Sequence, residues 1–136
     1  MASSFINAGA QLTITDATGA NIYTCPASTK AVIHACMVSN LNNSGTSKGT
    51  IKITTDGGST FRTVLKDAEI PPNDTLQMDK PLNLEAGDII RIYGTSTNME
   101  CFFLYFLITV SSFQLHHLLS YTYIHYQFLI PNNHHY

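Results

Sequence analysis

A period of two in hydrophobicity is clearest over residues 49–66. Ile51 and Ile53 alternate with polar side chains, which places the apolar residues on one face of a β-strand. A second arm follows at residues 61–66, where the alternation is blurred. Between the arms, Asp-Gly-Gly-Ser at 56–59 supplies residues that accept positive φ, as a tight turn requires. The pattern predicts a β-hairpin.

Shorter apolar segments flank this hairpin on both sides and are separated by Gly, Pro, Asn and Asp. No helical period of useful length occurs between them. The pattern therefore predicts an all-β fold, an antiparallel β-sandwich of jelly-roll or Ig-like order. Besides the hairpin, strands are expected at residues 12–15, 20–24, 31–38, 75–78, 88–93 and 99–110.

Two segments have unusual patterns. Residues 31–38 are apolar at nearly every position, which is typical of a central strand covered on both faces. His34 within this run is expected to be a hydrogen-bonded core histidine rather than a general base. Residues 2–9 are small and polar around Phe5 and Ile6, and this composition predicts an arm or leading edge before the first strand.

Length and charge narrow the class of protein. A chain of 136 residues predicts one domain, long enough to bury a core without metals or disulfides. The net charge is −2 and no basic run occurs, so we expect no nucleic-acid partner. The N-terminus has neither the basic nor the apolar region of a secretory signal.

The cysteines are an odd number at wide spacing, namely Cys25, Cys36 and Cys101. This arrangement predicts reduced thiols rather than a disulfide framework. Cys36 lies in an expected strand and should act as a small buried hydrophobe.

The sequence holds no motif of an enzyme or cofactor site. Asp56-Gly57-Gly58 could begin a calcium loop, but no second Asp follows at the required offsets, so a hairpin turn is favoured. Acidic residues beside Pro or Gly turns could form a catalytic pair, but solvated turn residues are the commoner case. We therefore expect no enzyme and no catalytic, cofactor-binding or metal-binding residues. The acidic residues of this kind are Asp67, Glu69, Asp79, Glu85 and Asp88.

The C-terminal part differs from the rest because every Asp, Glu, Lys and Arg lies at or before Glu100. It could be a membrane anchor, but residues 101–110 are half the length that a bilayer needs, and a membrane partner is disfavoured. It could bind a metal through His116, His117 and His125, although no acidic or cysteine ligand stands nearby.

Two further accounts of this anomalous uncharged tail remain. It could add a strand or helix to a neighbouring subunit. We favour a fourth account, in which residues after about 110 are no evolved part of the fold, as in a frame-shifted or read-through end. The expected organisation is a β-sandwich domain at 1–110 and a C-terminal extension at 111–136, poorly packed or not part of the fold.

Four segments occur together in an order that resembles small virion structural proteins of tailed bacteriophages. In that group a "tvPagktavI" segment, a "v.i..dgg" hairpin and a "L.aGD.i.v" segment follow one another. None of these motifs is catalytic, and the resemblance covers about residues 8–110. The matching segments are Ile-Tyr-Thr-Cys-Pro-Ala at 22–27, Lys-Ala-Val-Ile-His-Ala at 30–35, the hairpin at 50–65 and Leu-Asn-Leu-Glu-Ala-Gly-Asp at 82–88.

The resemblance implies a non-enzymatic virion protein that is made in the host cytoplasm. It would decorate the capsid or form part of the neck or tail, with other virion proteins and copies of itself as partners. Candidate contact surfaces are the loops at 40–48 and 94–98 and the arm at 2–7. The alternative is a carbohydrate-binding module of a receptor-binding or surface protein. Aromatics able to stack on sugars are few before residue 100, namely Tyr23, Phe61 and Tyr93.

Overall fold

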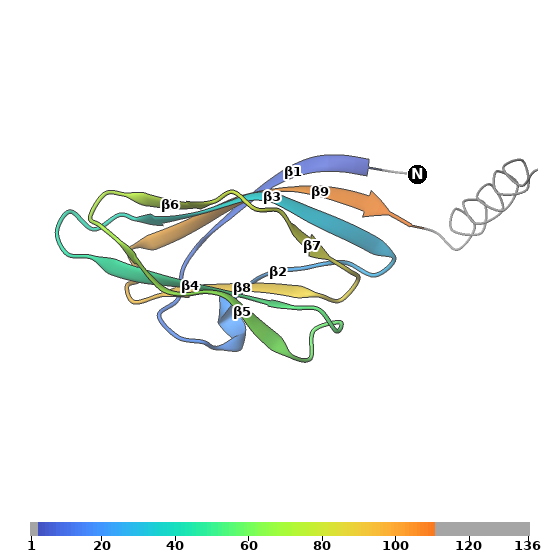
Figure 1. The fold of residues 1–136 in the computed structure, drawn as a ribbon, viewed down its shortest axis with the longest axis horizontal. Helices are drawn as coiled ribbons and strands as arrows, with labels where there is room; N and C mark the ends of the chain where they lie inside the picture. The colour runs from blue at the N-terminus through green and yellow to red at the C-terminus, as the bar shows by residue number, and fades with distance from the viewer. Residues whose placement is uncertain (1–2, 111–136) are drawn as a thin grey trace, which may run out of the picture.

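The computed structural model describes residues 3–110, which form two antiparallel β-sheets packed face to face (Figure 1). The prediction of an all-β sandwich is confirmed. Apart from one 3-10 turn, η1 (Thr18–Ala20), the regular elements of this part are strands. They are β1 (Ser3–Gln11), β2 (Asn21–Thr24), β3 (Thr29–Asn40), β4 (Ser47–Thr54), β5 (Phe61–Ile70), β6 (Thr75–Met78), β7 (Leu82–Leu84), β8 (Ile89–Gly94) and β9 (Met99–Thr109).

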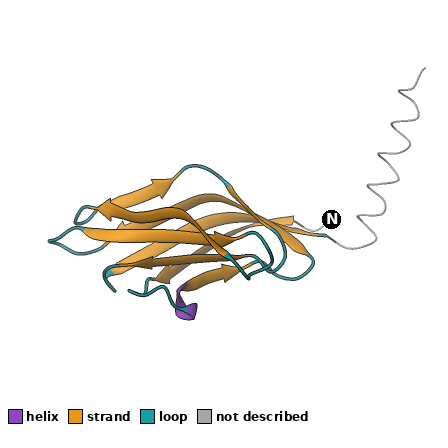
Figure 2. Cartoon of the chain, turned by 60° about the horizontal axis from the view of Figure 1, so that its bottom comes forward, coloured by secondary structure: helices purple, strands orange, loops and turns teal. Residues whose placement is uncertain are grey.

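The strand order is that of a jelly roll. Sheet A has the order β1-β9-β3-β6, with β7 also paired to β3, and sheet B has the order β2-β8-β4-β5. Most connections pass from one sheet to the other, and the first and last strands are neighbours, so the two layers seen in Figure 2 are linked many times. An Ig-like order is excluded, because there the first two strands share a sheet.

The core lies between the two inner faces. Sheet A contributes Ile33 and Phe103, and sheet B contributes Ile51, Ile90 and Ile92, all of them buried. The ring of Tyr23 packs near the ring of Phe103 at a centroid distance of 6.0 Å. The outward side chains of each strand therefore define the two surfaces of the sandwich.

The strand expected at 31–38 is β3, but it is not covered on both faces. Ile33 faces the core before a β-bulge and Cys36 faces it afterwards, because the register with β9 shifts across His34. A bulge adds one residue and reverses the phase of the alternation, so the run looks apolar on both faces in the sequence. His34 itself is exposed, and the expectation of a core histidine is wrong.

Residues 3–9 of the arm expected at 2–9 are part of β1, which pairs with β9 along its whole length. The first strand is therefore earlier than expected, and residues 12–15 form no strand of their own. Leu12 is buried in the core, and Thr13 makes a single bridge to Tyr93. The inward positions of β1 are mostly alanine, so its hydrophobic pattern is weak.

The remaining predicted strands correspond to β2, the β4–β5 hairpin, β6, β8 and β9. Within residues 3–110 no helix is long and apolar enough to cross a membrane, and residues 101–109, considered as the start of an anchor, belong to β9. The predictions made for 111–136, including the metal ligands His116, His117 and His125, lie outside the described residues.

Candidate interaction surface

The Asp56 turn closes the β4–β5 hairpin as predicted. One carboxylate oxygen of Asp56 accepts hydrogen bonds from the backbone N–H groups of Ser59 at 3.0 Å and Thr60 at 2.9 Å. These bonds, above all the one from Thr60, hold the pKa of Asp56 below its usual value. Among the described residues no group of three or more His, Cys, Asp or Glu side chains could hold a metal ion.

Asp88 departs from the prediction of a solvated turn residue, because it is 2% exposed. Its Oδ1 accepts hydrogen bonds from the Gly57 N–H at 2.9 Å and the Thr54 hydroxyl at 3.3 Å. Its Oδ2 accepts a bond from the Glu85 N–H at 2.9 Å. The carboxylate thus joins the β4–β5 turn to the β7–β8 turn, and its role is architectural.

Glycine allows these two turns to approach each other. Gly58 and Gly87 have φ values of +105° and +85°, and a Cβ on Gly58 would lie 2.9 Å from the Gly87 carbonyl oxygen. Two of the motifs behind the phage resemblance therefore form one structural unit.

The other acidic candidates are exposed, as expected, but Asp67 and Glu69 lie within β5 and not in a turn. Glu69 lies 3.9 Å from Lys48 Nζ, and Glu85 lies 3.3 Å from Lys30 Nζ. These contacts are surface ion pairs. The remaining two are Asp67 and Asp79.

All three cysteines are buried and free of disulfides, and the prediction for Cys36 is confirmed. Burial raises the pKa of the Cys36 thiol to about 12 and that of the Cys101 thiol to about 11. Neither thiol is suited to act as a nucleophile, because the reactive form is the thiolate.

The aromatics considered for sugar stacking are engaged by the chain itself. Tyr23 packs against Tyr105 in the core, with ring centroids 4.7 Å apart. The Arg91 guanidinium lies 3.7 Å above the Phe61 ring, and the Lys52 ammonium lies 5.6 Å from the Tyr93 ring centre. These three rings therefore form no open platform for a sugar.

Arg91 and Lys52 belong to a charged cluster on the outer face of sheet B. Both pair with Asp16, with 2.9 Å from Arg91 Nη1 to Asp16 Oδ1. Arg91 Nε also donates to Asn21 Oδ1 at 2.7 Å. The hydrogen bond with Lys52 is the largest cause that lowers the pKa of Asp16 and raises that of Lys52. The charges of this cluster are satisfied within the chain.

The two candidate contact loops, 40–48 and 94–98, meet at one end of the sandwich. Asn40 is fully buried and its amide nitrogen donates to the Ile70 carbonyl at 3.0 Å. Asn42 donates to the Ser96 hydroxyl at 3.2 Å and joins the two loops. These polar side chains are turned toward one another.

The outer face of sheet A differs from both of these regions, because an apolar band crosses it. Phe5 is 79% exposed, Phe102 is 41% exposed and Leu104 is 36% exposed. The rings of Phe5 and Phe106 lie 4.8 Å apart, which makes the band continuous from β1 to β9. The band consists of Phe5 on β1, Phe102, Leu104 and Phe106 on β9, and Val32 and Met37 on β3.

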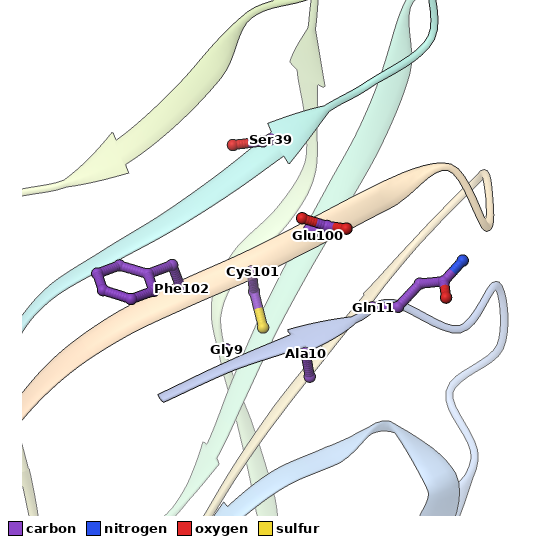
Figure 3. Close-up of a pocket in the computed structure, with 7 residues that line it drawn as sticks. All are labelled: Gly9, Ala10, Gln11, Ser39, Glu100, Cys101 and Phe102. Atoms are coloured by element: carbon purple, nitrogen blue, oxygen red, sulfur yellow. The ribbon is translucent and has the colours of Figure 1, made fainter. Parts of the chain in front are cut away.

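Two hollows interrupt this face. One, of about 210 Å³, lies beside Phe5, His34 and Leu104. The other, of about 350 Å³, lies where Gly9 has no side chain, next to Phe102. Figure 3 shows that its lining comes from β1, β3 and β9.

Sequence patterns do not indicate that this face is open. The outward Phe102, Leu104 and Phe106 belong to the same apolar run as the inward Phe103 and Tyr105. Periodicity shows which residues share a face, but it does not show whether other elements cover that face.

No family model matches the chain. No curated protein matches it either. Among solved structures, the chain is similar to one described as a pentameric capsid protein isolated from metagenomic phage sequences. The TM-score is 0.43 and the sequence identity is 16%, over 74% of this chain and 58% of that chain. This chain thus spans less than two thirds of that protein, and a likeness of this degree is too distant to indicate a function.

Proposed function

We propose that this protein is a non-enzymatic structural component of a tailed-phage virion. It would decorate the capsid or form part of the neck or tail through contacts with copies of itself and with other virion proteins. The observation that carries the proposal is the apolar band on the outer face of sheet A.

Exposure of this kind favours an interaction role. Single exposed apolar side chains are common, but contiguous exposed patches typically mark contact surfaces. Here Phe5 lies beside Phe106, and Leu104 and Phe102 follow Phe106 outward along β9 on the same face. Fully burying such a side chain contributes about 1.5–3 kcal/mol, and repetition of the contact around a particle multiplies it through effective concentration.

The strand order and the sequence motifs support the same proposal. Viral capsid domains are one class of jelly roll, together with lectins and cupins, so the fold alone does not choose among them. The phage-like motifs favour the virion class. Two of them meet around Asp88, which indicates that they serve the architecture of the sandwich.

Purification of particles from the source host tests the proposal. The protein is expected to sediment with assembled virions in a density gradient and to remain with them after a salt wash. Recovery only in the fraction of unassembled protein would overturn the virion role. A glycan array run on the purified chain addresses the carbohydrate-binding alternative, and no specific binding is expected.

A further inference from the structure

The two sheets formed by residues 3–110 have four edges, and three of these edges carry features that discourage pairing with another chain. β5 has charged side chains along its length, including Arg62, Lys66 and Glu69. β2 has only four residues and a register shift. β6 and β7 have four and three residues, and Pro81 directly precedes β7. Short strands, charges, prolines and irregular register are the devices by which proteins protect their edges.

The fourth edge, β1, has none of these devices. It is nine residues long, contains no charged residue and no proline, and keeps regular register with β9 throughout. Among the described residues no other strand pairs with it. Its free backbone groups therefore offer a template for one more strand.

The outer face of β1 is self-complementary about Asn7. Phe5, two residues before Asn7, projects as the most exposed large apolar side chain in the described part. Gly9, two residues after Asn7, opens the hollow beside Phe102. Phe5, Asn7 and Gly9 are all exposed on the same face of the strand. A projection and a hollow thus lie at equal distances from one central residue.

We propose that β1 pairs antiparallel with β1 of a second copy, with the two-fold axis at Asn7. In this register Phe5 of each copy lies opposite the partner's Gly9, and a change of rotamer that turns its ring away from Phe106 of its own chain places the ring in the hollow there. Aromatic side chains opposite glycine are a known way to stabilise strand pairs. The Asn7 side chains meet on the axis, where an amide can both donate and accept. The interface is isologous, with each contact made twice.

A second copy suits this edge better than an unrelated strand. Because β1 is uncharged, two copies approach without repulsion between like charges. The pairing also makes sheet A continuous across both copies and joins their apolar bands. One strand pair buries less than the roughly 800 Å² per partner of a standard interface, so a weak dimer strengthened by repetition is expected. For its biological setting this inference rests on the function proposed above.

Cysteine cross-linking of the full chain tests the pairing. On the axis, residue 7 faces itself at a Cα separation of about 4.5–5.5 Å, which a disulfide can span. Under mild oxidation, most of the protein carrying Asn7→Cys is expected to form a covalent dimer within minutes. The native cysteines are buried and should contribute little. Thr75→Cys, exposed on the opposite edge of the same sheet, is the matched control and should stay monomeric.

Two further variants test the register and the role of Phe5. A mixture of Ser3→Cys and Gln11→Cys chains should form the mixed dimer, and Ser3→Cys alone should not. Adding Phe5→Asp to Asn7→Cys should slow the cross-link at least tenfold, whereas Val64→Asp on sheet B should not. The proposal would be overturned if Asn7→Cys cross-linked no faster than Thr75→Cys does. It would also be overturned if Ser3→Cys linked to itself in preference to Gln11→Cys. If the protein sediments with virions but its Asn7→Cys variant stays monomeric, only the proposed dimer is refuted. If the variant forms the dimer but the protein is absent from virions, only the proposed virion role is refuted.

Discussion

The outer faces of the two sheets have opposite characters. On sheet B, Arg91 and Lys52 both pair with Asp16, and Arg91 also covers a phenylalanine ring. On sheet A, Phe5 and Phe102 are exposed, and no other described element lies over them. The outer face of sheet B is therefore occupied by contacts within the chain. The apolar side chains on the outer face of sheet A are exposed, as the proposed contact with another protein requires.

Because of this difference, substitutions on the two faces should affect different properties, namely the stability of the monomer and its association. Side chains of sheet B and its turns make their contacts in the folded monomer, so their removal should lower the free energy of unfolding. Outward side chains of sheet A contribute little to the monomer and should matter mainly when copies meet. Three predictions use this separation, beginning with the largest expected change.

The largest loss is expected for Asp88→Ala at the turns that border sheet B. The substitution leaves the Gly57 and Glu85 N–H groups and the Thr54 hydroxyl without their acceptor. Each buried donor without a partner costs about 1–3 kcal/mol, so a loss of about 4 kcal/mol is expected in urea unfolding. Asp79→Ala, an exposed aspartate, is the control and should change little. A loss below about 1 kcal/mol for Asp88→Ala would contradict this role.

The second prediction concerns the inner face of sheet A and its two thiols. Their folded-state pKa values of about 12 for Cys36 and about 11 for Cys101 exceed the ordinary value of 9.0. Above pH 9 the unfolded chain loses these protons first, so stability is full below pH 9 and falls as pH rises toward 11.

At pH 10 the two thiols together should lower the free energy of unfolding by about 3 kcal/mol relative to pH 8. Urea titrations at pH 8, 9 and 10 measure the slope. In a Cys36→Ala, Cys101→Ala double variant, most of this pH dependence should disappear. An equal slope in the double variant would show that other groups cause it.

The sequence predicted the architecture well where inward and outward residues differ in polarity. Ile51, Ile53 and the glycine turn indicated the hairpin, and alternation located most other strands. It failed at β1, where Ala8 and Ala10 occupy inward positions and carry little hydrophobic signal. It also failed at His34, because a bulge changes the facing of later residues without any mark in composition.

The candidate surface was predicted only in part. The arm at 2–7 was named as a contact surface, and its residues 3–7 lie in the open edge strand β1. The apolar band on β9 was not predicted. An aspartate after a glycine looks like a solvated turn residue, so the burial of Asp88 was also missed. Whether a sheet face or a carboxylate is buried depends on segments that are distant in the sequence. Local sequence patterns carry no information about such segments.

The smallest change is expected from a matched pair of substitutions on the two outer faces. Arg91→Ala removes an ion pair, a hydrogen bond to Asn21 and a cation–π contact, and should lower the free energy of unfolding by about 1–2 kcal/mol. Phe102→Thr keeps a residue that favours strands and should change stability by about 0.5 kcal/mol or less. Urea unfolding of both variants gives the comparison.

The effects of these two substitutions on association should be the reverse of their effects on stability. Phe102 lines the hollow at Gly9, so Phe102→Thr should slow the cross-linking of Asn7→Cys, whereas Arg91→Ala should leave its rate unchanged. If Phe102→Thr instead destabilises the monomer more than Arg91→Ala does, then the outer face of sheet A is part of the chain's own packing. The division between a face for stability and a face for association would then be wrong.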